Sequence, residues 1–145
     1  MKRFTQIICL TLVFIMVMAT TAFASEIPNP RASNYFGASS VYFWHTSGNN
    51  YQIWFDVTAV GTMTKLGVSE IKVLQSTDKV NWTTVKTYDM DDYSQMTRSN
   101  TVAHASYVPF TATTGYYYVA EVTLYAKNSS GTAEMTEETA ILDLR

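Results

Sequence analysis

The chain has 145 residues, of which 47% are hydrophobic, 14% aromatic and 15% charged, and its formal net charge is −2. This length predicts one domain with a hydrophobic core of its own. The slight acidic excess argues against nucleic-acid binding, because such binding needs a basic patch that neutralises phosphates.

Residues 1–24 have the three parts of a secretory signal peptide. Lys2 and Arg3 form a short positive region, residues 4–18 are mostly apolar, and Ala22-Phe23-Ala24 matches a small-x-small cleavage site. We therefore predict cleavage after Ala24 and a secreted, extracellular product that has no contact with the membrane. An uncleaved membrane anchor is the alternative, but the apolar run is short for the ~20 residues that a spanning helix needs.

Cleavage would change the charge and the cysteine content. The signal carries two of the 10 Lys and Arg residues and none of the 12 Asp and Glu residues, so the formal net charge would move from −2 to −4. The signal also carries Cys9, the only cysteine of the chain. The mature domain would then have no disulfide, no thiol nucleophile and no cysteine-bound zinc, and its stability would come from packing.

A hairpin opens the predicted domain. Residues 41–46 and 51–60 read as strands on either side of a turn at 47–50. If Thr46 pairs with Tyr51, cross-strand partners share a face, whereas a slip of one residue exchanges the faces of one strand. The expected core face contains Tyr42, Trp44, Ile53, Phe55, Val57 and Ala59. The expected outer face contains Phe43, His45, Gln52, Trp54, Asp56 and Thr58.

The middle of the chain is expected to alternate between loops and strands. The expected loops are residues 61–67, 76–81 and 89–100, and the expected strands are 68–75, 82–88 and 101–107. Pro109 ends the last of these strands or places it at a sheet edge, because proline cannot donate to a ladder. We expect Asp78 to cap the hairpin loop and Trp82 to pack in the core.

A long strand with a strict alternation follows at residues 115–131. Its even-numbered residues from Tyr118 to Ala126 are expected to face the core, whereas Tyr117, Glu121 and Tyr125 are expected to face outward. Asn128 to Gly131 has the composition of a turn. Residues 132–144 are predicted to return as the last strand.

These elements divide the chain into a signal peptide (1–24), an extended lead-in with at most a short edge strand (25–40) and a β domain (41–145). Seven or eight short strands without helical periodicity predict an all-β fold, a single antiparallel β-sandwich of the immunoglobulin or fibronectin type. A closed barrel is the alternative, because the sequence does not give the order of the strands.

Two resemblances support this interpretation. The pattern Ala126-x-Asn128-x-x-Gly131 after an aromatic strand, and Val108-Pro109 before it, resemble strand F of fibronectin type III domains. That resemblance implies that Tyr116 or Tyr118 lies near the tyrosine-corner position.

A second resemblance extends over nearly the whole mature chain. Its segments, residues 31–35, 55–58, 61–63, 71–82 and 115–118, are similar to a family of short secreted proteins of Gram-positive, largely anaerobic bacteria whose function is unknown. This family implies export and a single β-rich domain, and it implies no activity.

Residues with catalytic or metal-binding chemistry do not form a recognisable motif. His45 and His104 lack zinc-site spacing, and the segment with Asp89, Asp91 and Asp92 does not match a calcium loop, so an ordinary solvated loop is favoured there. Asp56 and Glu121 could approach one another as a glycosidase pair, but solubilising strand residues explain them better. We predict no metal, no cofactor and no enzyme activity.

Aromatic residues on the expected outer faces give the main functional signal. They are Phe43, Trp54, Tyr117 and Tyr125. Such side chains can stack on sugar rings or anchor a protein partner, although aromatic residues also favour strands for packing alone. The sequence therefore predicts a non-catalytic binding module for a glycan or protein ligand. A ligand-free structural domain is the alternative, and a small secreted hydrolase is a weaker one.

Overall fold

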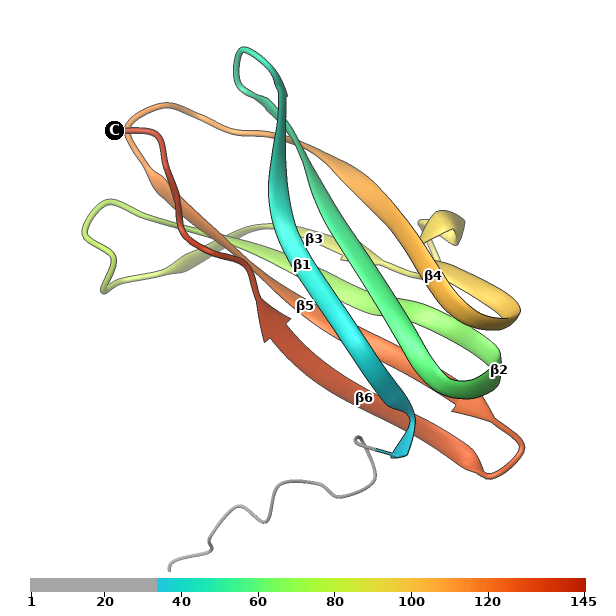
Figure 1. Ribbon diagram of the computed structural model, residues 1–145. Helices are drawn as coiled ribbons and strands as arrows, with labels where there is room; N and C mark the ends of the chain where they lie inside the picture. The colour runs from blue at the N-terminus through green and yellow to red at the C-terminus, as the bar shows by residue number, and fades with distance from the viewer. Residues whose placement is uncertain (1–33) are drawn as a thin grey trace, which may run out of the picture.

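The computed structural model describes residues 34–145 as one antiparallel sheet of seven strands with a short 3₁₀ turn at Ser94–Met96 (Figure 1). The strands are β1 (Phe36–Ser47), β2 (Asn50–Ser76), β3 (Thr83–Asp89), β4 (Thr97–Thr111), β5 (Tyr117–Asn128), β6 (Gly131–Glu138) and β7 (Leu142–Asp143). The all-β class predicted from the sequence is confirmed. The predicted signal peptide lies outside the described residues, and so does the lead-in as far as residue 33.

Strand β2 organises the sheet because its 27 residues pair with four other strands. The loop expected at residues 61–67 was wrong, since β2 continues through this segment. The side chains that flank the segment in the sequence, from Phe55 before it to Ile71 after it, are buried in the core. Burying them on both sides of the segment favours an extended chain between them. Register shifts against β4 and β5 mark where the strand bends.

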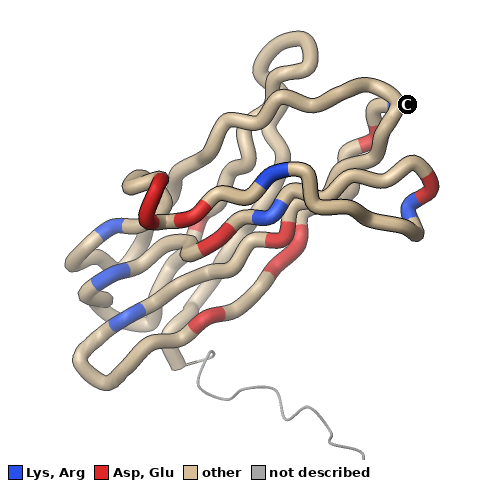
Figure 2. Tube along the Cα trace, turned by 180° about the vertical axis from the view of Figure 1, so that it is seen from behind, with Lys and Arg blue, Asp and Glu red and all other residues tan. Residues whose placement is uncertain are grey.

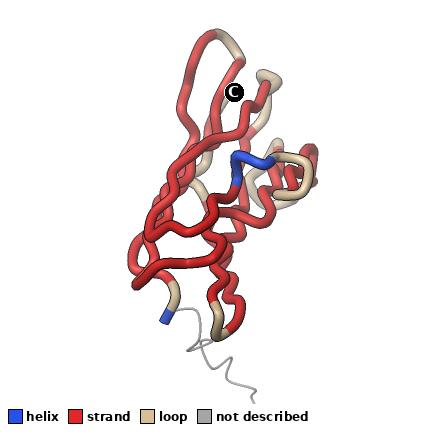
Figure 3. The backbone as a smooth tube through the Cα atoms, turned by 90° about the vertical axis from the view of Figure 1, so that its right-hand side faces the viewer, coloured by secondary structure: helices blue, strands red, loops and turns tan. Residues whose placement is uncertain are grey.

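The bend in β2 curls the sheet so that its two halves face one another across the core (Figures 1 and 3). Strands β1 and β4 flank the first half of β2, whereas β3 and β5 flank the second half, and β6 pairs with β5. The fully buried residues come from both halves and include Ile53, Phe55, Val57, Ile71, Val73, Val108, Val122 and Leu124. A hydrogen bond from Ser39 of β1 to Glu137 of β6 links two edges of the curl.

The predicted register between β1 and β2 was wrong by one residue. Ser47 pairs with Asn50, but the next pair is His45 with Tyr51, because a bulge at Thr46 inserts one residue into β1. The Thr46 hydroxyl donates a hydrogen bond to the carbonyl of Asn50, so the polar side chain of the extra residue has a partner within the hairpin. The bulge exchanges the faces of β1, so Phe43 lies on the inner side, and Tyr42 and Trp44 lie outside.

The loop expected at residues 89–100 was wrong in its second part. Only its beginning is a turn, in which the carbonyl of Asp89 accepts hydrogen bonds from the amides of Asp92 and Tyr93. Met96 is completely buried, and β4 begins directly after it. Pro109 lies within β4, so it does not end the strand. Among the described strands β4 pairs with β2 alone, which confirms the alternative of an edge position.

The alternation predicted for β5 is confirmed. Residues Tyr118, Ala120, Val122, Leu124 and Ala126 all belong to the core. The Tyr118 hydroxyl donates to the carbonyl of Thr113 and accepts from its amide. The last strand expected at 132–144 is divided into β6 and β7 by Thr139, whose hydroxyl accepts a hydrogen bond from the amide of Ala120.

Candidate functional site

The outer face of the first half of the sheet carries a row of aromatic side chains across three strands. Tyr42 of β1 lies opposite Trp54 of β2, and Trp54 lies opposite Tyr107 of β4. Directly opposite residues share a face, so the three rings lie side by side on the outer surface. The rings of Trp54 and Tyr107 are 5.0 Å apart at an angle of 33°. Trp44, two residues beyond Tyr42, is 58% exposed. We call these four residues the aromatic surface.

Polar groups border the aromatic surface at both ends. At one end Gln52 lies opposite Trp44, and its side-chain oxygen accepts a hydrogen bond of 2.9 Å from the Trp54 indole. At the other end Ser40, Asp56 and Thr58 line a shallow hollow of about 140 Å³. Amide, hydroxyl and carboxylate groups therefore lie next to the exposed rings, on the same strands.

The four aromatic residues predicted as a ligand-binding set are not brought together. Trp54 lies on the outer face as expected, and Phe43 packs against Tyr51 and Phe110 on the inner side. Tyr117 and Tyr125 belong to β5 in the second half of the sheet. The structure thus replaces Phe43 with Tyr42 and Trp44, and it adds Tyr107. In the sequence, the aromatic content of β1 and β4 was the signal for Tyr42, Trp44 and Tyr107. The correct register would have shown which of these rings face outward.

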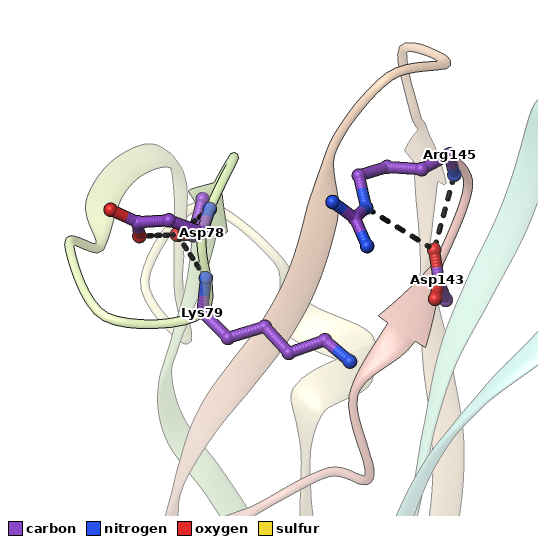
Figure 4. A network of polar contacts seen from close by, with 5 residues as sticks. Asp78, Lys79, Asp143 and Arg145 are labelled. Carbon is purple, nitrogen blue, oxygen red and sulfur yellow. Dashed lines mark hydrogen bonds and ion pairs between the residues drawn. The ribbon is translucent and has the colours of Figure 1, made fainter.

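Tyr117 is on the outer side of β5, but it is only 3% exposed. Lys79 reaches its ring from the loop after β2, with the ammonium 4.2 Å from the ring centroid. Arg145 reaches the same ring from the C-terminus, with a guanidinium distance of 3.9 Å. In Figure 4 these two cationic side chains extend toward one another across the strand between them. The Tyr117 ring is therefore occupied by cation–π contacts within the chain.

Charged residues are frequent along the strands of the second half of the sheet (Figure 2). Lys72 forms an ion pair of 2.7 Å with Glu70, and the hydrogen bond and the charge of Glu70 raise the pKa of Lys72. Glu121 lies between Lys72 and Glu138 in the cross-strand register. Asp56 lies on the first half of the sheet, so the structure does not place it with Glu121 as a glycosidase pair.

The loop between β2 and β3 is closed by Asp78, as expected. Its carboxylate accepts hydrogen bonds of 2.8 Å from the amides of Val80 and Asn81 and one from the Asn81 side chain, and these bonds hold the pKa of Asp78 well below its usual range. The core position expected for Trp82 was wrong. Trp82 is partly exposed, and with Leu74 it lines an outer groove of about 280 Å³.

The two histidines bind backbone carbonyls at separate places. His45 contacts the carbonyl of Gly48, and His104 contacts that of Gln95, each at 2.9 Å. Among residues 34–145, no three His, Cys, Asp or Glu side chains are grouped closely enough to hold a metal ion. The same part of the chain contains no helix with the length and hydropathy needed to cross a membrane.

Comparison of the chain with protein-family models, with curated proteins and with solved structures found no match. The aromatic surface is therefore defined as a candidate site by its own geometry.

Proposed function

We propose that the protein is a non-catalytic extracellular binding module that holds a glycan on the aromatic surface. The observation that carries this proposal is the row Tyr42–Trp54–Tyr107 together with Trp44. Tyr42, Trp44 and Tyr107 are each at least 40% exposed, and all four residues share one face of three adjacent strands. A soluble domain rarely leaves so many large rings in one exposed group without an interaction to make.

The chemistry around the rings favours a glycan over a protein ligand. The faces of aromatic rings carry negative partial charge, and they attract the weakly positive C–H groups of a sugar ring. The hydroxyl groups of the same sugar need polar partners, which Gln52 and Asp56 supply at the two ends of the surface.

We infer that the curled sheet is a β-sandwich of the immunoglobulin or fibronectin type. The contact of the Tyr118 hydroxyl with the backbone of Thr113, five residues upstream, supports this assignment. A tyrosine near the start of strand F makes the same kind of bond in such domains. Secretion, proposed from the signal sequence of residues 1–24, would expose the aromatic surface to extracellular glycans.

A binding assay with Trp44→Ala tests the proposed function. The secreted protein is screened against cell-wall polysaccharides and mucin-type glycans, and binding is measured by the change in tryptophan fluorescence. Trp44→Ala should weaken binding roughly tenfold, because it removes one stacking ring and the area that the ring buries. The matched control is Trp82→Ala, which removes a partly exposed indole from the other half of the sheet.

The outcomes separate the alternatives. Equal losses from Trp44→Ala and Trp82→Ala would contradict the assignment of the site to the aromatic surface. If no glycan binds at millimolar concentration, the proposal fails, and the ligand-free structural domain or a protein partner takes its place. Hydrolysis of a bound glycan by the wild type would contradict the non-catalytic part of the proposal.

A further inference from the structure

A second concave region lies between β3 and the C-terminal end of β4, where the two halves of the sheet face one another. It is a pocket of about 340 Å³, which we call the β3–β4 pocket. Its lining includes Gln75, Lys86, Tyr88, Phe110, Thr113 and Tyr118. This volume is at the lower end of the range of small-molecule sites, roughly 300–1,000 Å³. The pocket is separate from the aromatic surface, and nothing in the proposed function uses it.

The wall of the pocket is aromatic and held in place by internal bonds. The rings of Phe110 and Tyr118 meet edge to face at 5.2 Å. The Tyr88 hydroxyl donates to the carbonyl of Pro109 and so joins β3 to β4. Burial, with a smaller contribution from Tyr93, raises the pKa of Tyr88 to about 12, so this donor stays protonated at neutral pH. These contacts fix a buried aromatic floor, and the exposed side chains of Val85 and Pro109 supply the apolar lining that a ligand ring can reach.

Lys86 is directed toward this pocket by a β-bulge. The register shift between β2 and β3 leaves Val85 unpaired and places Lys86 opposite Val73, a fully buried core residue. Cross-strand partners share a face, so the Lys86 side chain begins on the inner side of the sheet. Its ammonium lies 5.4 Å from the centroid of the Tyr88 ring. The ion pairs among residues 34–145 do not include Lys86, and no carboxylate lines the pocket.

Few polar groups of the pocket are without a partner among the described residues, and those few can bind an anion. The hydroxyls of Tyr88 and Tyr118 already form hydrogen bonds with backbone groups. Within the described part of the chain, the side chains of Gln75, Lys86 and Thr113 form no hydrogen bond with other residues. They offer an amide, an ammonium and a hydroxyl group to a ligand. One cation with two neutral groups suits a single carboxylate better than a phosphate dianion, which needs more donors.

We propose that the β3–β4 pocket binds a small cyclic carboxylate of the uronic-acid type. The carboxylate would accept hydrogen bonds from Lys86 and Gln75, the ring would pack on Val85 and Pro109 above the aromatic floor, and a ring hydroxyl would bond to Thr113. An acidic sugar combines these three features in one molecule. The site would add selection for acidic sugars to a protein whose aromatic surface has no such cation.

Amide chemical shifts of the secreted protein, titrated with sodium glucuronate, test this proposal. Glucuronate should shift the amides of Gln75, Lys86 and Thr113, and glucose should bind at least about tenfold more weakly because it lacks the carboxylate. Lys86→Gln should lower the affinity for glucuronate by a similar factor, and Lys86→Arg should retain it. The matched control Lys127→Gln removes the same charge from the exposed end of β5 and should leave binding unchanged.

Three results would overturn the proposal. They are equal binding of glucose and glucuronate, shifts by inorganic phosphate as large as those by glucuronate, and unchanged glucuronate affinity in Lys86→Gln. If Lys86→Gln does not fold, salt decides instead, because wild-type binding must weaken with ionic strength if an ammonium recognises the ligand. Trp44→Ala must retain glucuronate binding, so a failure of the proposed function and a failure of this inference remain distinguishable.

Discussion

The α-carbon of Gly67 lies against the carbonyl oxygen of Met96. A Cβ atom at Gly67 would be 2.1 Å from this oxygen and 2.8 Å from the α-carbon of Thr97. The backbone of Gly67 also has a φ of +150°, a conformation that residues with a Cβ atom rarely adopt. This contact lets the start of β4 pack onto the bend of β2 and buries Met96. A residue with a Cβ atom at this position would push the two backbones apart.

Gly67→Ala should lower the free energy of unfolding by roughly 2–5 kcal/mol, from backbone strain and overpacking together. Urea denaturation followed by tryptophan fluorescence measures this loss. The control is Gly61→Ala in the same strand, where a Cβ would meet nothing within 4 Å. Gly61→Ala should be neutral or slightly stabilising, because alanine reduces the entropy of the unfolded chain. Similar stabilities for the two variants would contradict the role assigned to Gly67.

The hydroxyl of Tyr118 should contribute to the free energy of unfolding in addition to the packing of its ring. Tyr118→Phe removes the partner of both the amide and the carbonyl of Thr113 while the ring, which is 1% exposed, stays in place. We expect a loss of about 1–3 kcal/mol in thermal or urea unfolding. Tyr116→Phe is the matched control, since the described residues show no hydrogen bond to that hydroxyl. An equal effect of the two changes would show that the corner contact is dispensable.

Asp78 should make the stability of the protein depend on acid pH. Its bonds to the amides of Asn81 and Val80 lower its pKa in the folded state below the unfolded value of about 3.9. A group with a lowered folded pKa stabilises above the unfolded pKa, and this contribution is lost as the pH falls through and below about 4. Asp78→Asn should therefore flatten the decline in melting temperature between about pH 5 and pH 2.

The control for this pH experiment is Asp92→Asn. It removes the same charge from an exposed carboxylate that accepts none of the hydrogen bonds described for residues 34–145. Its acid profile should follow that of the wild type. If Asp78→Asn also follows the wild type, the capped loop does not contribute to acid unfolding.

The two cations over Tyr117 should hold the C-terminus on the sheet. Arg145→Ala removes the guanidinium that lies 3.9 Å from the ring, and the expected cost is about 0.5–1 kcal/mol. Faster hydrogen exchange of the Tyr118 amide, which is next to β7, should accompany this loss. A double-mutant cycle with Lys79→Ala shows whether the two cations act independently. Unchanged exchange in both variants would contradict a role for these contacts in docking β7.

The sequence by itself determined the all-β class and the inner face of β5. A strict alternation of apolar residues has one solution when one face is buried, so Tyr118 to Ala126 could be assigned without a structure. Turn chemistry was equally local, and the cap by Asp78 followed from residue type and spacing.

Only the tertiary structure decided the register of β1 and the continuity of β2. A bulge at Thr46 changes which ring of β1 is exposed, and no local pattern separates Thr46 from its neighbours. Residues 65–67 pair with β4 on one edge and with β5 on the other, and this pairing overrides the glycine-rich composition of the segment 61–67. The aromatic surface depends on the register of β1, since it exists only where β1, β2 and β4 align their rings on one face. Long-range pairing therefore determined the candidate site, and local preference determined the strands that carry it.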